Sequence, residues 1–439
     1  MAASPARAAA FDILARVERE GAYATELLHS RSLETLDERD RGLATELVMG
    51  VLRWRSRIDG AIAAASWQKL AKLDVEVLTA LRLAVYQVQF LERIPARAAV
   101  NESVELVKRA RKASASGYVN AVLRKIKKAA APSVQPQTPN ELADVHAHPA
   151  WLVDRWVREF GFEAAAKICG YDQQVPTTAI RLDDAELEQE MSRESVELAA
   201  GALLTRARRV TAGDVTRTRA FREGRVQVQD EASQLVALLV GRGERLLDCC
   251  AAPGGKTAAL AARNPTASII AAELHPHRAR LLRQRVGAPN VKVLAADANA
   301  LPLASDFDRV LADVPCSGTG TLARNPEIKW RLKPDDLRDL HARQVAILNA
   351  ALDRLGRGGK LVYSTCSLER AEDEDVIAEV LSARTELRLL PARAELEALR
   401  AEGEIASADI DSLVRGDFLR TLPGVHPCDG FFAAVLTRV

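Results

Sequence analysis

The sequence lacks the features that mark secreted proteins, membrane-spanning proteins and proteins that bind zinc through cysteine pairs. Its 439 residues include only six cysteines, and no two of these are spaced as Cys-x-x-Cys. Six cysteines do not make a disulfide framework in so long a chain, and the missing spacing argues against zinc. No run of about 18 apolar residues occurs, and the first residues have no continuous apolar core before a cleavage site. We therefore expect a cytoplasmic protein with reduced thiols.

The composition indicates a folded protein of several domains. Hydrophobic residues make up 48% of the chain and charged residues 27%. This balance allows a sizeable core and excludes wholesale disorder and low-complexity architecture. At roughly 150 residues per domain, the length predicts about three domains.

The net charge of +2 conceals a basic front and an acidic remainder. Residues 1–130 carry 22 Lys and Arg against 15 Asp and Glu, whereas residues 131–439 carry 39 against 44. The basic residues concentrate between positions 108 and 128, with no acid between them: Lys108, Arg109, Arg111, Lys112, Arg124, Lys125, Lys127 and Lys128. Such a run is typical of a surface that binds a polyanion. From charge alone, a solvated helix face is an equally good interpretation.

Residues 1–130 have the pattern of a helical bundle. Leu78, Leu81, Val85 and Val88 recur at three- and four-residue steps, which places them on one helix face. Three prolines follow within residues 131–140, and we expect residues 131–142 to form a linker, because proline removes helical donors. The linker should separate two architectures.

The remaining chain has the pattern of α/β structure. Residues 143–222 mix helical and strand-like pieces and predict a small α/β subdomain. From residue 223 to 439, short apolar runs alternate with helical patterns, which predicts a parallel sheet with crossover helices. The expected strands are 245–247, 267–272, 291–295, 307–311 and 360–363. A last strand-like run at 430–439 could close the edge of the sheet.

A glycine-rich turn follows the first expected strand of this sheet, at residues 248–257. It resembles a Walker A loop, but that motif needs glycine at position 250, which is Cys250, and the dinucleotide pattern G-x-G-x-x-G is absent. A simple tight turn remains an alternative. At a helix N-terminus, such a turn lets backbone amides approach a ligand. The candidate cofactor residues here are Cys250, Ala251, Ala252, Pro253, Gly254, Gly255 and Lys256.

Acidic residues end the next expected strands. Glu273 and Asp297 follow the second and third strands, and Asp313 follows the fourth. A carboxylate at this position can accept both ribose hydroxyls of a nucleoside. Because the turn has no pyrophosphate motif, S-adenosylmethionine fits this cleft better than a dinucleotide.

Two cysteines lie on loops beside the same expected cleft. Cys316 follows the fourth strand and Cys366 the fifth. A buried structural role is the usual one for a thiol, and we expect it for Cys169 and Cys428. The loop positions of Cys316 and Cys366 favour a chemical role instead.

These motifs resemble those of the RNA cytosine-5 methyltransferases, a family with two active-site cysteines. The resemblance rests on residues 248–257, 313–320 and 365–367, and it extends to 221–233, 324–330 and 429–432. Residues 40–54 and 119–124 are similar to the NusB-type helical RNA-binding domain of the bacterial 16S ribosomal RNA branch. Two departures occur: Glu273 stands where many members have Asp, and Asp373 stands within a run that is commonly Glu-Asn-Glu.

The resemblance implies a fold, an activity and a set of roles. The fold is an all-α NusB-like bundle, a small α/β subdomain and a Rossmann-like class I methyltransferase domain. The activity is methyl transfer from S-adenosylmethionine to carbon 5 of a cytosine in 16S rRNA. Cys366 would add to carbon 6, since carbon 5 alone is a poor nucleophile. Asp313 would hold the ring, Lys256 would assist, and Cys316 would take part in product release.

Several alternatives remain open. The same reaction could act on tRNA or large-subunit rRNA, or the chain could be a non-catalytic NusB-like RNA-binding scaffold. A P-loop kinase or helicase is opposed by Cys250. The pairs His146/His148 and His275/His277 lack further ligands, so we expect no metal. The RNA partner is expected to use the basic run, with its target base removed from the stack.

Overall fold

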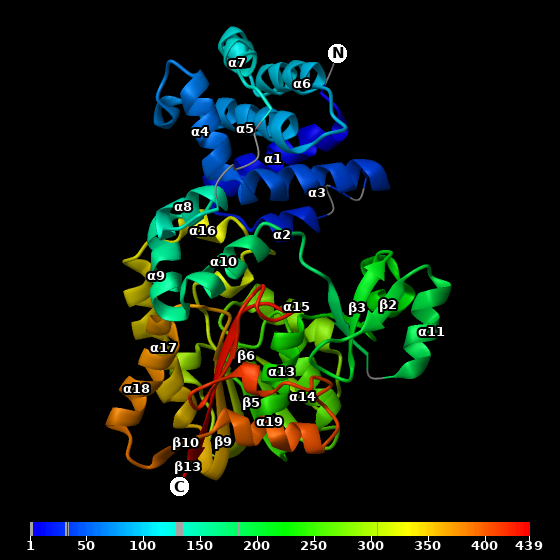
Figure 1. Cartoon of the computed structure of the whole chain (residues 1–439). Helices are drawn as coiled ribbons and strands as arrows, with labels where there is room; N and C mark the ends of the chain where they lie inside the picture. Colours follow the sequence, from blue (N-terminus) through cyan, green and yellow to red (C-terminus); the bar gives the residue numbers. More distant parts are fainter. Residues whose placement is uncertain (1–2, 31–32, 34, 129–134, 183, 305) are drawn as a thin grey trace. The chain divides into compact units, whose positions relative to one another are not determined.

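The computed structural model describes residues 3–30, 33, 35–128, 135–182, 184–304 and 306–439 (Figure 1). The chain divides into two compact units. Unit 1 comprises residues 1–175 and 322–331, and unit 2 comprises residues 176–321 and 332–439. A short segment from the second half of the sequence therefore belongs to the unit that is built mainly from the front of the chain.

Unit 1 is built from helices around one apolar core. Helix α5 is its most buried helix: Leu81 and Val85 are fully buried, whereas Leu78 and Val88 are half-buried. The predicted helical bundle is confirmed. The helices are α1 (Pro5–Glu20), α2 (Ala24–Leu28), α3 (Glu38–Arg53), α4 (Arg55–Ala65), α5 (Val75–Phe90), α6 (Ala96–Arg109), α7 (Ser116–Leu123), α8 (Pro139–Val145), α9 (Ala150–Phe160), α10 (Phe162–Tyr171) and α16 (Ile328–Arg331).

The expected linker and the boundary after it differ from the structure. Helix α8 begins at Pro139, where Thr138 and Glu141 form a capping box, so the last part of the predicted linker is helical. Residues 129–134 lie outside the described residues. Helices α8–α10 belong to unit 1 and not to the small α/β part. One physical reason is that Gln173, just after α10, donates its side-chain amide to the carbonyl oxygen of Arg53 at 3.3 Å.

The segment 322–331 packs among the helices of unit 1. The backbone amide of Ala24 donates to Glu327 at 2.9 Å, and the Trp330 indole donates to the carbonyl oxygen of Leu52 at 2.6 Å. The Arg331 guanidinium donates to the carbonyl oxygen of Val17 at 3.0 Å. These bonds satisfy buried polar groups that the segment would otherwise leave unpaired.

Unit 2 begins with a small antiparallel sheet in the order β2-β3-β1-β4. Ile180, Met191 and Val226 are buried in its core. The small α/β element of the predicted fold is therefore present. Its elements are β1 (Ala179–Arg181), α11 (Ala185–Arg193), β2 (Glu197–Ala200), β3 (Ala207–Ala212), α12 (Arg219–Arg222) and β4 (Gln227–Val228).

The main sheet of unit 2 has nine strands in the order β11-β12-β13-β9-β8-β5-β6-β7, with β10 paired to β13. Strands β5–β9 are parallel to one another. The strands are β5 (Arg245–Asp248), β6 (Ser268–Glu273), β7 (Val291–Ala295), β8 (Phe307–Asp313), β9 (Leu355–Thr365), β10 (Leu387–Leu390), β11 (Val414–Arg415), β12 (Phe418–Thr421) and β13 (Phe431–Arg438).

Helices cover both faces of this sheet (Figure 1). Leu246 packs with α13, α14 and α19 on one face, whereas Leu247 packs with α17 and α18 on the other, as the alternation of a strand requires. The predicted Rossmann-like arrangement is confirmed. The helices are α13 (Glu231–Val240), α14 (Gly255–Arg263), α15 (Pro276–Val286), α17 (Asp336–Leu352), α18 (Glu374–Ala383) and α19 (Ala392–Ala401).

The last strand does not close the edge of the sheet, contrary to expectation. β13 lies antiparallel between β9 and β12, and it also pairs with β10. Its apolar residues Phe432 and Ala434 are fully buried, which an interior position demands. Among the described helices, none combines the length and the apolar character needed to cross a bilayer.

Candidate active site

The glycine-rich turn joins β5 to α14 at the carboxyl edge of the parallel strands. Asp248 is the last residue of β5, and α14 begins at Gly255, as predicted. Gly254 caps the helix with a φ of 113°, a conformation that glycine adopts without strain. Thr257 donates its hydroxyl to Asp248 at 2.7 Å, and burial raises the pKa of Asp248 to about 7.

Asp313, at the end of β8, joins the turn to β9. One carboxylate oxygen accepts from Nζ of Lys256 at 2.7 Å, and the other accepts from the Ser364 hydroxyl at 2.7 Å. Burial lowers the pKa of Lys256, but its attraction to Asp313 and its hydrogen bond with it outweigh burial, so that pKa lies above the ordinary value. The lysine is therefore held as an ammonium ion at the strand edge.

The structure brings the two candidate cysteines together. The sulfur atoms of Cys316 and Cys366 lie 3.4 Å apart, and both residues are half-buried. The hydrogen bond to Cys366 raises the pKa of the Cys316 thiol well above its ordinary range, and burial raises it further. Cys316 therefore holds its proton. The Lys256 ammonium lies close enough to Cys366 for the two groups to interact electrostatically.

The sequence did not predict the role of Glu372. Its fully buried carboxylate accepts from the backbone amide of Ser317 at 2.8 Å, from the Ser317 hydroxyl, and from the Ser367 hydroxyl at 2.5 Å. Gln344 donates to it at 2.9 Å. Glu372 thus ties the loop after Cys316 to the loop after Cys366. The signal in the sequence that could have indicated this role is the cluster of carboxylates soon after Thr365-Cys366-Ser367.

Asp373 is a second buried acid, and it supports the loop after Cys366. Asp373 accepts from Thr365 at 2.5 Å and pairs with Arg420 at 2.8 Å. Arg420 also donates to the carbonyl oxygen of Ser367 at 3.1 Å. Burial raises the pKa of Asp373 well above its ordinary range, although Arg420 opposes that shift. The residue noted as a departure from the family pattern is thus part of a buried ion pair.

Two glycines allow the loops to approach each other. Gly320 accepts from the amide of Gly430 at 2.8 Å, and its own amide donates to the carbonyl oxygen of Cys366 at 2.9 Å. A Cβ atom on Gly320 would overlap the carbonyl group of Gly430. The start of β13 therefore holds the Cys316 loop in place, which gives the residues before β13 a positioning role.

The acidic residues expected at the cofactor cleft occupy different environments. Glu273 is the last residue of β6, is buried, and accepts from the amide of His275 at 3.0 Å. Asp297 lies two residues beyond β7 instead of ending it; it is exposed and caps a short 3₁₀ helix at Asn299. Cys250, Ala251, Ala252 and Pro253 lie in the turn before α14, at the edge that also holds Asp313.

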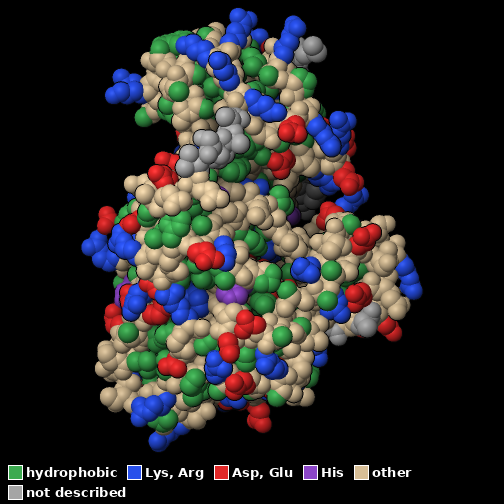
Figure 2. Space-filling model, in the orientation of Figure 1, with side chains coloured by type: hydrophobic (Ala, Val, Ile, Leu, Met, Phe, Trp, Pro, Cys, Tyr) green, Lys and Arg blue, Asp and Glu red, His purple; other side chains and the backbone are tan. Residues whose placement is uncertain are grey.

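Three of the eight residues of the basic run are paired with acids in the structure. Lys108 pairs with Glu105, Arg109 with Asp12 and Lys112 with Asp74, at 2.7 to 2.9 Å. These acids lie outside the run, so the sequence alone did not pair them. The remaining members, which are all exposed, are Arg111, Arg124, Lys125, Lys127 and Lys128. Figure 2 shows Lys and Arg side chains gathered over this part of unit 1.

An exposed aromatic residue beside the basic run was also missed. Trp67 is 62% exposed, and Nζ of Lys125 lies 5.5 Å from the centroid of its ring. Tyr118 meets the same ring edge-on, at 4.8 Å between ring centroids. An exposed indole beside cations is a surface on which an unpaired base can stack. No described group of three or more His, Cys, Asp or Glu is arranged to hold a metal ion.

Comparison with known proteins defines the class. Residues 235–437 match the family model "16S rRNA methyltransferase RsmB/F", and residues 4–128 match the NusB family. The solved structure PH0851 covers 100% of both chains with a TM-score of 0.83 and 24% identity, a likeness that concerns the fold. A helical NusB domain joined to this Rossmann-like domain defines an RNA methyltransferase.

Full-length relatives identify the family within this class. The "Probable ribosomal RNA small subunit methyltransferase B" of Bacillus subtilis is 35% identical over 448 residues, which cover 98% of each chain. "Ribosomal RNA small subunit methyltransferase B" of Pseudomonas putida is 35% identical and covers 80% of this chain and 83% of its own. The chain belongs to the 16S rRNA methyltransferase RsmB/F family.

Proposed function

We propose that this enzyme transfers a methyl group from S-adenosylmethionine to carbon 5 of a cytosine in 16S rRNA. The observation that carries the proposal is the pair of sulfur atoms 3.4 Å apart, beside the Lys256–Asp313 ion pair. Methyl transfer to oxygen or to an exocyclic nitrogen needs no thiol. Transfer to carbon 5 needs one, because the ring must first be activated.

The turn after β5 and the neighbouring strand ends fit the cofactor. One oxygen of the buried Asp248 carboxylate has no hydrogen-bond partner among the described residues, so a polar group of a ligand can use it. We propose that Cys250 to Lys256 and Glu273 line the site, with Asp297 and Asp313 at its borders. S-adenosylmethionine supplies an electrophilic methyl group when it is bound.

Cys366 is the proposed nucleophile. Its thiolate sulfur forms a bond to carbon 6 of the cytosine, and the electron pair of the carbon 5–carbon 6 double bond becomes available at carbon 5. Carbon 5 then forms a bond to the methyl carbon, whose bond to the sulfonium sulfur of the methyl donor breaks and leaves its electron pair on that sulfur. Asp313 holds the ring near N3 and the exocyclic amine, and the ammonium of Lys256 offsets negative charge at the site.

Cys316 is proposed to act after methyl transfer. The carbon 5 proton must leave, its bonding electrons restore the double bond, and the carbon 6–sulfur bond breaks to return the Cys366 thiolate. While Cys366 is free, the hydrogen bond to it is the largest cause of the raised pKa of Cys316. Bond formation at Cys366 removes that cause and lowers the pKa of Cys316, so its thiol can release its proton to solvent, and the resulting thiolate accepts the carbon 5 proton.

Unit 1 is proposed to select the RNA. Its exposed cations Arg124, Lys127 and Lys128 can contact phosphates, and Trp67 can stack on an unpaired base. The match of residues 4–128 to the NusB family supports this role. The target cytosine is expected in a loop or another loosely paired segment, because the base must leave its stack to reach Cys366.

Mapping the modified nucleotide tests the proposal. The enzyme is incubated with unmodified total RNA and S-adenosylmethionine labelled in the methyl group, and the labelled RNA is digested and sequenced. We expect 5-methylcytidine at one position of 16S rRNA. Label in tRNA or large-subunit rRNA would contradict the substrate, and label on a nitrogen or a ribose oxygen would contradict the chemistry.

A further inference from the structure

Helix α17 carries a buried glutamine that the proposed mechanism does not use. Gln344 is fully buried, and its side-chain nitrogen makes two hydrogen bonds. It donates to the carbonyl oxygen of Pro315 at 3.0 Å and to the carboxylate of Glu372 at 2.9 Å. These two bonds attach the helix to the loop that carries Cys316.

The two bonds belong to a closed ring that includes Cys316. Pro315 directly precedes Cys316, and because proline has no amide hydrogen, its carbonyl oxygen is its sole backbone hydrogen-bonding group. Ser317 directly follows Cys316, and its amide donates at 2.8 Å to Oε1 of Glu372, the same oxygen that accepts from Gln344. The peptide groups on both sides of Cys316 are thus fixed, one by Gln344 and the other by Glu372.

These contacts explain why a carboxamide occupies position 344. One nitrogen supplies two hydrogens to two acceptors without bringing a further charge into a buried site, and the reverse orientation of the amide would place its oxygen against both acceptors. The amide oxygen of Gln344 has no hydrogen-bond partner among the described residues. An unpaired buried acceptor costs about 1 to 3 kcal/mol, so this residue is not the best choice for stability alone.

The far side of Glu372 is held by two further hydrogen bonds. His341, one turn before Gln344 on α17, donates from Nδ1 to the carbonyl oxygen of Ala371 at 2.6 Å. The buried Tyr363 hydroxyl, on β9, donates to the carbonyl oxygen of Glu372 at 2.6 Å. Glu372 is therefore fixed relative to α17 and β9, and a loop that bonds to both Gln344 and Glu372 has one defined position.

We propose that Gln344 is a positioning residue that holds Cys316 for removal of the carbon 5 proton. The inference rests on the proposed function and concerns its second half, in which Cys316 takes the proton and the bond between Cys366 and carbon 6 breaks. A base must lie within hydrogen-bond reach of the proton that it removes, and a misplacement of about 1 Å can lower a rate about 100-fold.

The hydrogen bonds of Glu372 separate the two halves of the reaction. Gln344 and the Ser317 amide bond to Oε1 of Glu372, whereas the Ser367 hydroxyl, beside Cys366, donates to Oε2. Loss of Gln344 removes contacts on the Cys316 side and leaves the bond to Ser367. It should therefore slow release of the product more than it slows methyl transfer.

The test measures free methylated RNA and protein-bound methylated RNA in one time course. Full-length enzyme is incubated with 16S rRNA transcript and S-adenosylmethionine labelled in the methyl group, and samples are stopped in denaturant. The variant is Gln344→Met, which has a side chain of similar length and lacks both donors. We expect the protein-bound fraction to rise at least about tenfold above wild type, while the single-turnover rate of methyl transfer changes less than about threefold.

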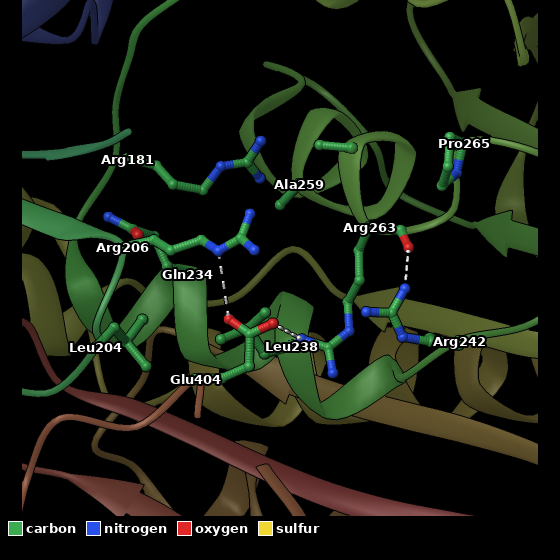
Figure 3. A pocket seen from close by; sticks show the side chains of 11 residues that line it. Arg181, Leu204, Arg206, Gln234, Leu238, Arg242, Ala259, Arg263, Pro265 and Glu404 are labelled. Carbon is green, nitrogen blue, oxygen red and sulfur yellow. Dashed lines mark hydrogen bonds and ion pairs between the residues drawn. The ribbon is translucent and has the colours of Figure 1, made fainter. Parts of the chain in front are cut away.

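Gln234→Met is the matched control, on α13. Gln234 is also buried, and its side-chain nitrogen donates to a backbone carbonyl oxygen, that of Gln229, at 2.8 Å. Figure 3 shows Gln234 among the residues that line a pocket on α13 and α14, and none of those lining residues belongs to the loops of Cys316 and Cys366. We expect this variant to lose stability without accumulating protein-bound RNA.

Cys316→Ala is the positive control, and it distinguishes failure of the inference from failure of the proposed function. If Cys316→Ala forms no protein-bound RNA, the proposed mechanism is contradicted, and the role of Gln344 with it. If Cys316→Ala forms it and a folded Gln344→Met enzyme has the wild-type fraction, only the role of Gln344 is contradicted. Equal slowing of transfer and release, or equal accumulation in Gln234→Met, would show a general structural effect and would also overturn the proposal.

A milder variant and a measurement on the wild type cover the case in which Gln344→Met does not fold. Gln344→Asn keeps the amide but is one methylene group shorter, so it cannot reach both acceptors, and the same rise in the protein-bound fraction is expected. In the wild type, hydrogen exchange at the Ser317 amide should be at least about 100-fold slower than at an exposed amide. Exchange there as fast as at an exposed amide would contradict a fixed Cys316 backbone.

Discussion

At the residue scale, the active-site loops depend on one buried carboxylate that touches neither sulfur. Glu372 accepts hydrogen bonds from Ser317 and Ser367, the residues that directly follow Cys316 and Cys366. The separation of the two sulfur atoms is therefore set through this residue. Small displacements of reacting groups cost much rate, because the aligned geometry supplies much of the acceleration.

Replacing Glu372 should lower the rate of methyl transfer more than it weakens RNA binding. Glu372→Gln loses one acceptor oxygen and places an amide donor opposite the Ser317 or Ser367 donors. We expect kcat to fall by roughly 100-fold while KM for RNA changes less than threefold. Steady-state kinetics with labelled cofactor measure both. Glu379→Gln, an exposed change on α18, is the matched control, and equal kinetics in the two variants would contradict the role of Glu372.

The buried Lys329 should make the stability of the protein depend on pH. Burial lowers the pKa of Lys329 to about 7, and its Nζ has no hydrogen-bond partner among the described residues. An unfolded lysine titrates near 10.4, so between about pH 7 and pH 10 the unfolded chain binds more protons than the folded one. The contribution of Lys329 to stability therefore rises with pH in this window and is least favourable below pH 7.

Lys329→Met should remove this dependence. At each pH, the free energy of unfolding of the wild type is subtracted from that of the variant. We expect this difference to be more positive at pH 6.5 than at pH 9.5, by a few kcal/mol. Urea unfolding at several pH values measures it. Lys333→Met, at an exposed lysine, should show no such trend. A stability difference that does not change with pH would show that Lys329 titrates normally.

At the scale of elements, the start of β13 and the Cys316 loop fit together without room for a side chain. Their contact is the hydrogen bond from the Gly430 amide to the Gly320 carbonyl oxygen, and each glycine lies where a Cβ atom would overlap the other chain segment. An antiparallel strand at the end of the chain thus fixes a loop more than 100 residues earlier.

Gly320→Ala should disturb the site through this contact. The added methyl group forces the loop and β13 apart, and we expect a loss of about 2 kcal/mol in stability and at least a tenfold loss of kcat. Gly60→Ala is the control, because Gly60 lies in α4 with open space around it, and alanine there should stabilise the helix by roughly 0.5 to 1 kcal/mol. Thermal unfolding measures the stability of both variants, and steady-state kinetics measure their kcat. Wild-type behaviour of Gly320→Ala would refute the close fit.

The sequence predicted elements whose signal is local. The alternation of apolar runs and helical patterns located β5–β9, because a parallel strand buried on both faces is a continuous apolar run bounded by turns. The interior place of β13 was missed, because the partners of an antiparallel strand are not written in its own residues. Glu372 was missed for a related reason: its partner Ser317 lies 55 residues away along the chain.

At the scale of the whole molecule, the chain does not divide as its prolines indicate. The segment 322–331 returns to unit 1 only six residues after Cys316, and it is bonded there through Glu327 and Trp330. Sequence patterns cannot reveal this return, because the segment is short and its partners are backbone atoms of distant helices. Deleting residues 1–130 would therefore unpair buried groups of this segment as well as remove an RNA-binding surface.

Charge-neutralising variants test RNA binding by unit 1 without that damage. Arg124, Lys127 and Lys128 are exposed, and changing all three to Gln should raise the Kd for 16S rRNA about tenfold or more and reduce the salt slope by roughly 2. Fluorescence anisotropy at several salt concentrations measures both. Arg193, Arg343 and Arg357, changed together to Gln, supply the matched loss of charge on unit 2. Equal slopes in the two triple variants would exclude a specific role for unit 1.

The central claim is that the sulfur of Cys366 becomes transiently bonded to the target cytosine, and one measurement tests it most directly. Cys316→Ala enzyme is incubated with 16S rRNA and S-adenosylmethionine and then run on a denaturing gel. We predict a protein–RNA band that survives denaturation, because release is blocked after the sulfur–carbon bond has formed, and no such band when Cys366→Ala is combined with Cys316→Ala. A band that persists without Cys366, or undiminished methyl transfer by Cys366→Ala alone, would contradict the account.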